Sequence, residues 1–450
     1  MQEHTTNEVK ALVEELTEVL EDVLEEALPV TKQEKTDLKE LEEVTVAAMK
    51  RVGQRFLELL VQACQPTEVA KTIPCRCGGT AEYKRHREGT VITLMGQIRI
   101  KRAYHLCPDC RQGTYLLDEK LGFRAGAFSA ALQEMLAAIG VQVPSFEAAS
   151  ELFERLTLVS ISDNGVREAT EGIGQERLEA AWDPKRLELP EGPSQPPRRL
   201  YGSVDGTSVH IEEGWREAKL GSWYRTDDPP LDEVPEKWEP HAEEITYYGD
   251  IAEAEEFGRL MYVTGVQRGA DRAEELIFIA DGAQWIWKLV EEHFPNAIQI
   301  VDWYHAAEYI WGVAHAVYGE GSDLAQAWAE KRLTELWEGE IEAVIWAFRA
   351  HLNSALGKGA AQKAITYFQN NRDRMRYPEF RAKGYQIGSG TIESGCKRVI
   401  GARLKQAGMI WTLEGARQLI KARTMYLSGE WDEFCQQRQP PRRTYQRRAA

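Results

Sequence analysis

Three aspartates, Asp205, Asp281 and Asp302, each directly follow a short hydrophobic stretch that predicts a β-strand. Aspartate is unfavourable inside strands, and α/β proteins gather their reactive groups at strand ends. Carboxylates on neighbouring strand ends repel one another unless a hard cation lies between them. The pattern therefore predicts a divalent metal site. The alternative for any one of the three is that it caps the helix or turn that follows.

A fourth acidic residue, Glu393, lies in the small-residue segment Gly-Ser-Gly-Thr-Ile-Glu-Ser-Gly-Cys-Lys, residues 388–397. Lys397 is four residues further along the same helix face, and Arg398 and Arg403 are close in sequence. A carboxylate beside basic groups suits binding of metal and phosphate together. A surface ion pair is the alternative.

Four of the seven cysteines form two close pairs, Cys75 with Cys77 and Cys107 with Cys110. Two such pairs on tight turns can bind one Zn²⁺ tetrahedrally, and a site with four thiolates has no open position for catalysis. We predict one structural Zn²⁺, with Gly78 and Gly79 supplying the unusual backbone angles of the tight first turn. Buried free cysteines are the alternative.

Basic residues that could contact phosphate groups occur in three regions. The cysteine-containing region has Lys84, Arg85, Arg87, Arg99, Lys101 and Arg102. The region after Glu393 has Lys397, Arg398, Arg403 and Lys405, and the C-terminal tail has Arg438, Arg442, Arg443, Arg447 and Arg448. Solvated basic surfaces without a ligand are the alternative reading.

The chain has 450 residues, 43% hydrophobic and 28% charged, which predicts several folded domains. It has no apolar run long enough to cross a membrane and no secretion signal at its start, so we expect a cytoplasmic protein without membrane contact. The net charge of −16 is unevenly distributed, because residues 1–60 and 212–259 are acidic whereas 66–118 and 382–450 are basic. Nucleic-acid binding is therefore compatible with the charge.

The N-terminal half predicts helices, then strands, then helices again. Residues 7–29 and 33–64 have apolar residues at helical spacing, which predicts a helical hairpin packed on the rest of the chain or a dimerisation arm. Residues 66–118 alternate as short strands. Three short helices follow, and we expect Asn164, Arg167 and Glu168 of the third to face outward. A DNA-binding helix-turn-helix unit and a trihelical bundle without DNA contacts remain alternatives.

The C-terminal half predicts an α/β sheet domain with a helical insertion. The predicted strands are 200–204, 261–266, 276–280 and 297–301, and the predicted helices between them are 268–275 and 284–293. The complete division is 1–65 helical, 66–118 zinc-ribbon-like, 119–185 helix-turn-helix-like, 186–199 linker, 200–430 catalytic with a helical insertion at 306–378, and 431–450 a basic tail.

Four motifs occur in a distinctive order: Asp205-Gly-Thr, Asp281-Gly-Ala, Asp302-Trp-Tyr-His305, and Gly-Ser-Gly-Thr-Ile-Glu393-Ser. In this order the chain resembles the DDE transposases of bacterial insertion sequences, of the ISKra type and related to Mutator-like transposases. The resemblance covers about residues 200–425. It implies an RNase H-like core, a helical insertion before Glu393 and transposon DNA as substrate.

The resemblance also implies roles for individual residues. Asp205, Asp281 and Glu393 would hold two Mg²⁺ or Mn²⁺ ions for cleavage of DNA and joining of its 3′ ends to target DNA. Asp302 and His305 would be an accessory pair that positions Asp281 or contacts DNA, although His305 could instead be a packed core histidine.

The N-terminal modules would, by the same resemblance, bind the terminal inverted repeats, and the protein would be nucleoid-associated. Because two DNA ends must meet, we expect a homodimer or higher oligomer. Two other readings stay open: a zinc-dependent DNA-binding regulator with an inactive core, and a metal-dependent nuclease without strand transfer.

Overall fold

The computed structural model describes residues 2–33, 35–66, 68–181, 191–227, 240–353 and 357–438. Two compact units divide the chain, one formed by residues 1–173 with 433–450 and the other by residues 174–432. Much of the predicted linker and the tail arginines from Arg442 onward lie outside the described residues. No helix in the described ranges has the length and apolar character needed to cross a bilayer.

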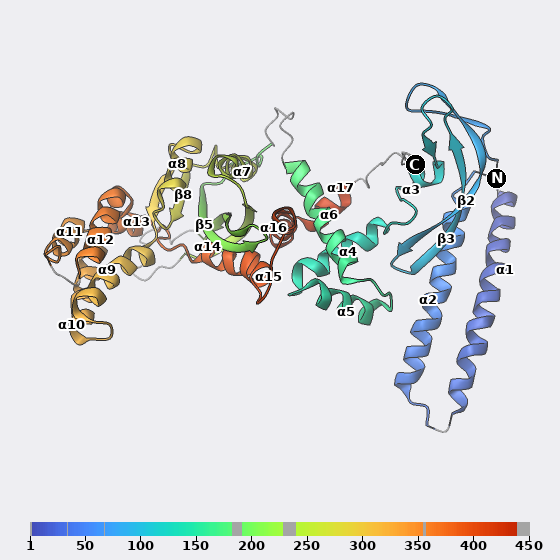
Figure 1. The fold of residues 1–450 in the computed structure, drawn as a ribbon, viewed down its shortest axis with the longest axis horizontal. Helices are drawn as coiled ribbons and strands as arrows, with labels where there is room; N and C mark the ends of the chain where they lie inside the picture. Colours follow the sequence, from blue (N-terminus) through green and yellow to red (C-terminus); the bar gives the residue numbers. More distant parts are fainter. Residues whose placement is uncertain are drawn as a thin grey trace. The chain divides into compact units, whose positions relative to one another are not determined.

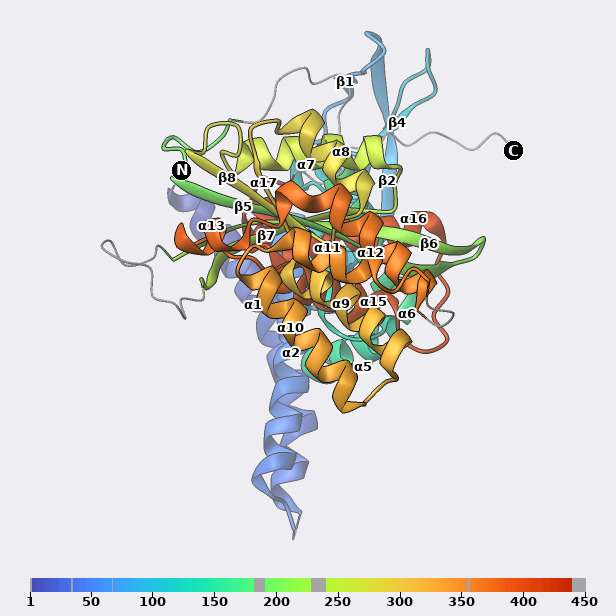
Figure 2. The ribbon, with the colours of Figure 1, turned by 90° about the vertical axis from the view of Figure 1, so that its left-hand side faces the viewer.

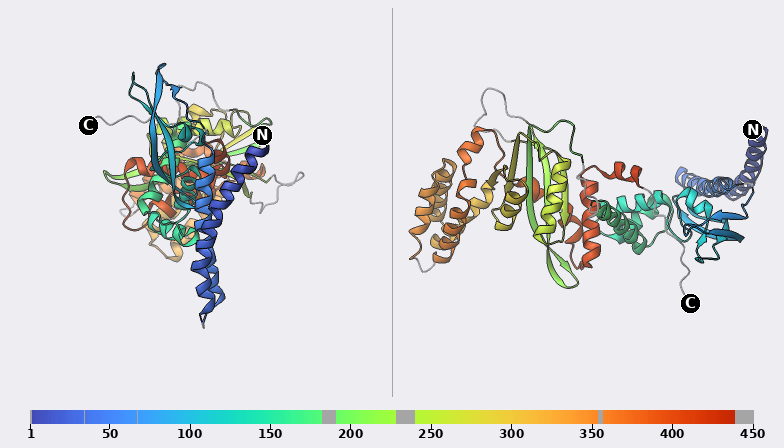
Figure 3. Two further views of the ribbon diagram at one scale, coloured as in Figure 1. Left: turned by 90° about the vertical axis from the view of Figure 1, so that its right-hand side faces the viewer. Right: turned by 90° about the horizontal axis from the view of Figure 1, so that it is seen from above.

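The first unit begins with the predicted helical hairpin (Figures 1 and 3). Helix α1 (Gln2–Ala27) is followed by the 3₁₀ helix η1 (Leu28–Lys32) and by α2 (Leu38–Ala63). The Asp37 side chain caps α2 by accepting a hydrogen bond from the Glu40 N–H at 2.9 Å. The expected pair of amphipathic helices is confirmed, and Val23 of α1 and Leu59 of α2 are buried.

The predicted β module is an antiparallel sheet in the order β1-β2-β3-β4. Its strands are β1 (Thr72–Pro74), β2 (Thr80–Thr93), β3 (Gly96–Leu106) and β4 (Gly113–Thr114), and α3 (Leu116–Leu121) follows. The long hairpin β2–β3 turns between Thr93 and Gly96, and the two tight turns that carry the cysteines lie at its open end.

Three helices follow: α4 (Ala130–Gln142), α5 (Phe146–Thr157) and α6 (Asp163–Ala181). A serine precedes each helix, and its hydroxyl accepts a backbone hydrogen bond from the first turn, at 3.1 to 3.3 Å. Apolar side chains from all three, including Leu136 and Phe153, form a small core. The predicted trihelical unit is confirmed as a fold.

The second unit contains a five-stranded mixed sheet in the order β7-β6-β5-β8-β9. Strands β5 (Arg199–Ile211), β6 (Gly214–Thr226) and β7 (Ala242–Asp250) are antiparallel, whereas β8 (Glu275–Ala280) and β9 (Ile298–Val301) run parallel to β5. Strands β6 and β7 lie in the acidic stretch for which the sequence predicted no element.

Two predicted elements are wrong. Residues 261–266 are not a strand but the end of α7 (Ala254–Gln267), because Phe257 and Met261 are four residues apart and bury the same helix face. Residues 268–275 are not a helix but a turn that leads into β8. The predicted helix at 284–293 is confirmed as α8 (Gln284–His293).

Helices cover both faces of this sheet (Figure 1). α7 and α8 lie on one face. α14 (Gly390–Gly395), the π-helix Cys396–Gly401 and α16 (Leu413–Leu427) lie on the other. Buried ion pairs to Asp250 fix α16: Lys421 Nζ lies 2.8 Å and Arg417 Nε 2.7 Å from its carboxylate oxygens.

The predicted helical insertion is confirmed between β9 and α14 (Figure 2). It comprises α9 (Trp303–Tyr318), α10 (Asp323–Trp337), α11 (Ile341–Arg349), α12 (Lys358–Asn371), the short η2 (Arg372–Arg374) and α13 (Tyr377–Ala382). Its apolar side chains and those of the sheet form one continuous core. The short α15 (Ala402–Leu404) and α17 (Trp431–Gln437) complete the described helices.

Candidate functional site

The strand register places the three aspartates side by side. Ser203 of β5 is level with Ile279 of β8, so Asp205 and Asp281, two residues further along parallel strands, share one level. The neighbouring pair β8–β9 likewise brings Asp302 level with Asp281. Residues that are level on adjacent strands point to the same face. Asp205 pairs with Leu220 of β6, which faces α14 and the π-helix.

Asp205 is half-buried, and its neighbours affect its pKa. Burial raises the pKa of Asp205, and the Asp281 carboxylate adds to this, while the Gly206 N–H, the Cys396 thiol and His305 act in the opposite direction. The net pKa is raised. The Gly206 N–H donates to the Asp205 carboxylate at 2.7 Å. Asp205 therefore lies in a site where two negative charges already repel each other.

Glu393 reaches this site from α14. Its carboxylate oxygen lies 4.0 Å from Nε2 of His305 and accepts a hydrogen bond from the Ser389 hydroxyl at 3.3 Å. Cys396, one turn further on, is hydrogen-bonded to Asp205, and burial raises its thiol pKa, with the charges of Asp205 and Glu393 adding to the effect. Glu393 therefore shares two neighbours with Asp205: His305, which lies 4.0 Å from Glu393, and Cys396, which lies on the next turn.

His305 lies at the start of α9, and only 33% of its side chain is exposed. Burial lowers its pKa, but the carboxylates of Asp302, Glu308 and Asp281 outweigh burial, so the net pKa is raised. Nδ1 lies 3.3 Å from the Glu308 carboxylate. The surrounding carboxylates therefore stabilise the protonated form of His305 more than water would, and its Nε2 faces Glu393.

Asp302 is fully buried. One carboxylate oxygen accepts the His305 N–H at 2.7 Å and caps α9, and the other accepts the N–H of Ser389 at the start of the segment that carries Glu393. Asp302 therefore links the end of β9 and the start of α9 to the segment that carries Glu393.

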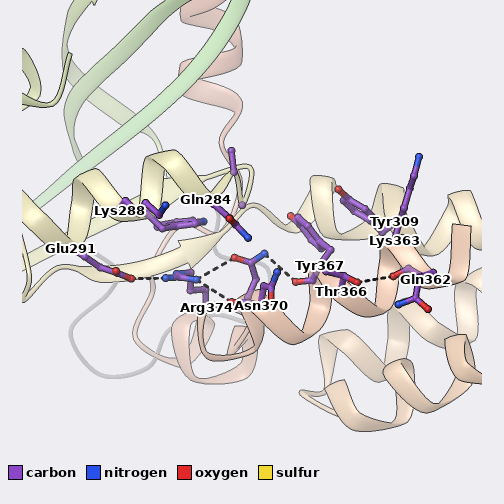
Figure 4. A pocket seen from close by; sticks show the side chains of 14 residues that line it. Gln284, Lys288, Glu291, Tyr309, Gln362, Lys363, Thr366, Tyr367, Asn370 and Arg374 are labelled. Carbon is purple, nitrogen blue, oxygen red and sulfur yellow. Dashed lines mark hydrogen bonds and ion pairs between the residues drawn. The ribbon is translucent and has the colours of Figure 1, made fainter. Parts of the chain in front are cut away.

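A cavity of about 690 Å³ lies beside Asp281, between α8 and α12 (Figure 4). The Tyr367 hydroxyl donates to the Asp281 carbonyl at 2.7 Å and the Tyr367 ring stacks on Tyr309, which forms one wall. Lys288 and Lys363 line the cavity from α8 and α12. The remaining lining is mostly amide and hydroxyl side chains, together with Arg374, which pairs with Glu291. The cavity has polar and apolar walls in similar measure, and its lining side chains include more cations than carboxylates.

Three arginines predicted to contact phosphate groups have buried side chains. The guanidinium of Arg102 lies 2.6 Å from the Asp118 carboxylate, and that of Arg403 lies over the Trp411 ring. The side chain of Arg438 is 3% exposed, and its guanidinium lies 3.4 Å from the Glu134 carboxylate. The prediction is wrong for these three residues. The exposed members of the predicted set are Lys84, Arg85, Arg99, Lys101, Arg167, Lys397, Arg398 and Lys405. As predicted, Asn164 and Glu168 are exposed beside Arg167 on α6.

The four paired cysteines converge. Their sulfur atoms all lie within 4.8 Å of one another, with Cys75 Sγ 3.5 Å from Cys110 Sγ and Cys77 Sγ 3.7 Å from Cys107 Sγ. Zn–S bonds of about 2.3 Å in a tetrahedron place sulfur atoms about 3.8 Å apart. A backbone hydrogen bond from Cys77 lowers the pKa of Cys75 to about 7. This quartet could bind a metal ion such as zinc.

Gly78 shows why the short first cysteine pair is possible. Its φ of +89° is a left-handed conformation that glycine adopts without strain, and its N–H donates to the Cys75 carbonyl at 3.0 Å. At Gly79 an added Cβ would lie 2.3 Å from the Asp109 carboxylate. Both glycines therefore serve the turn, one by conformation and one by close packing.

The carboxylates are less tightly grouped than the cysteines. The oxygens of Asp205, Asp281 and Glu393 do not all lie within 4.8 Å of one another. The sequence also did not reveal the roles of Cys396 and Ser389. Both lie within one turn of Glu393, and that spacing was the available signal.

A model of an uncharacterised protein family (UPF0236) matches residues 31–219. The match runs from the hairpin through the cysteine module and α4–α6 to β6, and it includes Asp205 but none of the later acidic motifs. No curated protein matches the chain.

Proposed function

We propose that this protein is a DDE-type DNA transposase with an RNase H-like core. The observation that carries the proposal is the gathering of Asp205, Asp281 and Glu393, from three distant motifs, around one edge of a mixed sheet. A long first strand at the centre of the sheet, β5, runs antiparallel to β6 and in the same direction as β7, β8 and β9, and this arrangement supports an RNase H-like core. The continuous helical insertion before Glu393 supports the same fold.

The donor set fits divalent cations. Asp205 and Asp281 offer hard oxygen ligands. The pKa of Asp205 is raised first by burial and further by the Asp281 carboxylate, and a bound cation would oppose both effects. Two Mg²⁺ or Mn²⁺ ions held by Asp205, Asp281 and Glu393 would supply Lewis-acid activation of the attacking and leaving oxygens of a phosphodiester. A water or a DNA 3′-hydroxyl would be the nucleophile.

The neighbouring residues hold this acidic site in place. Asp302 ties the start of α9 to the Ser389 backbone, so Glu393 has a fixed position relative to β9. When His305 is protonated, it would place a positive charge 4.0 Å from Glu393 and offset part of the negative charge at the site. The cations Lys288 and Lys363 would hold the phosphates of the DNA strand that leaves the site past Asp281.

The first unit would bind the element ends. One structural Zn²⁺ on the cysteine quartet would fix the β2–β3 hairpin, whose exposed Arg85, Arg99 and Lys101 face solvent beside it. The outward residues of α6, with Arg167 among them, would make the second contact as a helix-turn-helix-like unit.

The test is a Mg²⁺- or Mn²⁺-dependent cleavage and strand-transfer assay on labelled DNA that carries the element's own ends. We expect cut and joined products from the wild type, and neither from Asp205→Asn, Asp281→Asn or Glu393→Gln, with end binding retained. Asp271→Asn, an exposed aspartate at the turn before β8, is the matched control and should keep both activities.

Other results of this assay would distinguish the two alternative functions, a nuclease and a DNA-binding regulator. Cut product without joined product would identify a nuclease. End binding without cleavage in any divalent metal would identify a regulator with an inactive core. Loss of activity in Asp271→Asn as well would show that the assay reports general damage to the protein.

A further inference from the structure

The hairpin formed by α1 and α2 exposes an unusual number of large apolar side chains. On α1 these are Val9, Val13, Leu20 and Leu24, exposed by 37 to 55%. On α2 they are Leu38, Val46, Met49, Phe56 and Leu60, exposed by 42 to 72%, and Leu28 of η1 is exposed by 54%. Exposed apolar patches of this extent mark interaction surfaces in proteins that are otherwise charged.

The exposed residues of each helix form one stripe. At about 100° per residue, Val9, Val13, Leu20 and Leu24 fall within a sector of about 60° on α1. They lie beside the inward-facing row that contains the buried Val23, so this stripe is an additional apolar face that the hairpin seam leaves uncovered.

Two ion pairs show that the stripes of α1 and α2 lie on the same side of the hairpin. Arg51 pairs with Glu26 and Arg55 pairs with Glu15 across the seam, so these four residues define one side of it. On both helices the apolar stripe lies about 140° around the axis from the ion-pair residues. Both stripes are therefore on the side opposite to the ion pairs.

The stripes are also in register along the hairpin. With the Glu15–Arg55 ion pair as the marker of level, Val13 lies near the level of Phe56 and Leu20 near the level of Met49. The same register puts Val9 near Leu60 and Leu24 near Val46. The result is an apolar face of successive layers, which is the arrangement that one half of a four-helix bundle presents.

We infer that this face binds the same face of a second copy of the chain, forming a four-helix bundle. The apolar face runs from Leu38 to Leu60 along α2, about 33 Å, and a two-helix face about 20 Å wide then covers about 660 Å². Two such faces would bury about 1,300 Å², within the range of about 1,200–2,000 Å² of stable interfaces. A layered face of uniform apolar character is self-complementary under a two-fold axis, as an isologous contact requires. The inference does not depend on the proposed function.

The experiment is sedimentation equilibrium of the full chain over a range of protein concentrations, for the wild type and for Val13→Lys, Phe56→Lys and the double variant. The matched controls are Ala11→Lys and Ala47→Lys, which place the same charge on exposed positions of α1 and α2 outside the apolar face. Circular dichroism melting checks that every variant is folded.

The wild type and both controls should be dimers at micromolar concentration. Each substitution on the face should raise the dimer dissociation constant about a hundredfold or more, because it places an ammonium group among buried apolar side chains. A monomeric wild type would overturn the inference. So would a dimer that all the lysine variants leave intact, because the interface would then lie elsewhere.

Discussion

Replacing Asp302 by alanine tests whether the site is assembled from β9, α9 and α14 as the structure indicates. In the wild type this carboxylate is fully buried and accepts the N–H groups of His305 and Ser389, which lie on different elements. Alanine removes both acceptors without adding bulk. The Ser389 N–H then remains buried without its partner, and the segment that carries Glu393 is no longer tied to α9.

The magnitude follows from the two hydrogen bonds. Loss of a helix N-cap costs about 0.5–2 kcal/mol, and loss of a hydrogen bond to a buried charged group costs about 1.5–3 kcal/mol. The sum is about 2–5 kcal/mol in the free energy of unfolding. Because the Ser389 contact precedes Glu393 by one helical turn, we also expect cleavage to fall while binding of DNA persists.

The assay is urea unfolding followed by circular dichroism, with cleavage kcat and DNA affinity measured on the same preparations. Glu308→Ala is the matched control, since Glu308 also lies near His305 but is 73% exposed. The control should change stability by less than about 0.5 kcal/mol. An Asp302→Ala variant as stable as the control would refute the positioning role. If DNA affinity alone fell, direct contact of Asp302 with DNA would be the better explanation.

Three further changes have expected outcomes. Asp250→Asn removes the carboxylate that Lys421 pairs with and should cost about 3–5 kcal/mol in urea unfolding. Burial opposes the charged form of Asp250, but its cationic partners outweigh burial and hold its pKa below the usual value; wild-type stability should therefore fall as pH drops below about 4, and less so in the variant. Lys288→Glu with Lys363→Glu should weaken DNA binding and reduce the slope of log affinity against log salt by about 2, measured by fluorescence anisotropy. Cys77→Ser should lose bound zinc by atomic absorption and destabilise the β module, whereas Cys64→Ser should keep both.

Much of the fold was predictable because the strongest signals are local. The helical spacing of apolar residues predicts the α1–α2 hairpin, and alternating residues bounded by turn residues predict the β2–β3 hairpin. Strand β6 was not predicted because Arg216 and Glu217 occupy its solvent-exposed start. Its later residues are buried because β6 lies between β5 and β7, a pairing that the local sequence does not indicate. Residues 261–266 were mistaken for a strand because a short apolar run has no period of its own, and Phe257 was needed to show the helix.

The site was predictable as a set of motifs but not as a set of contacts. The strand-end aspartates could be recognised because carboxylates are rare there. Cys396 and Ser389 contact the acidic site through the turn from α14 to the π-helix, and no sequence period encodes that turn. The cavity beside Asp281 depends on how α12 packs against α8, which is a property of the tertiary structure.

Two of the misassigned arginines, Arg102 and Arg403, lie at positions whose spacing already indicated burial, although their charge suggested a surface position. In β3, Ile98, Ile100 and Arg102 alternate with exposed residues, so Arg102 is in phase with the buried positions of its strand. In the turn of helix that ends at Leu404, Arg403 follows the buried Cys396, Val399 and Ile400 at three- and four-residue steps. Both arginines therefore continue the buried face of their element. A cation in phase with a buried face needs an internal partner, as Asp118 is for Arg102, and basic residues out of phase with that face, such as Arg99, are the ones available to a phosphate backbone.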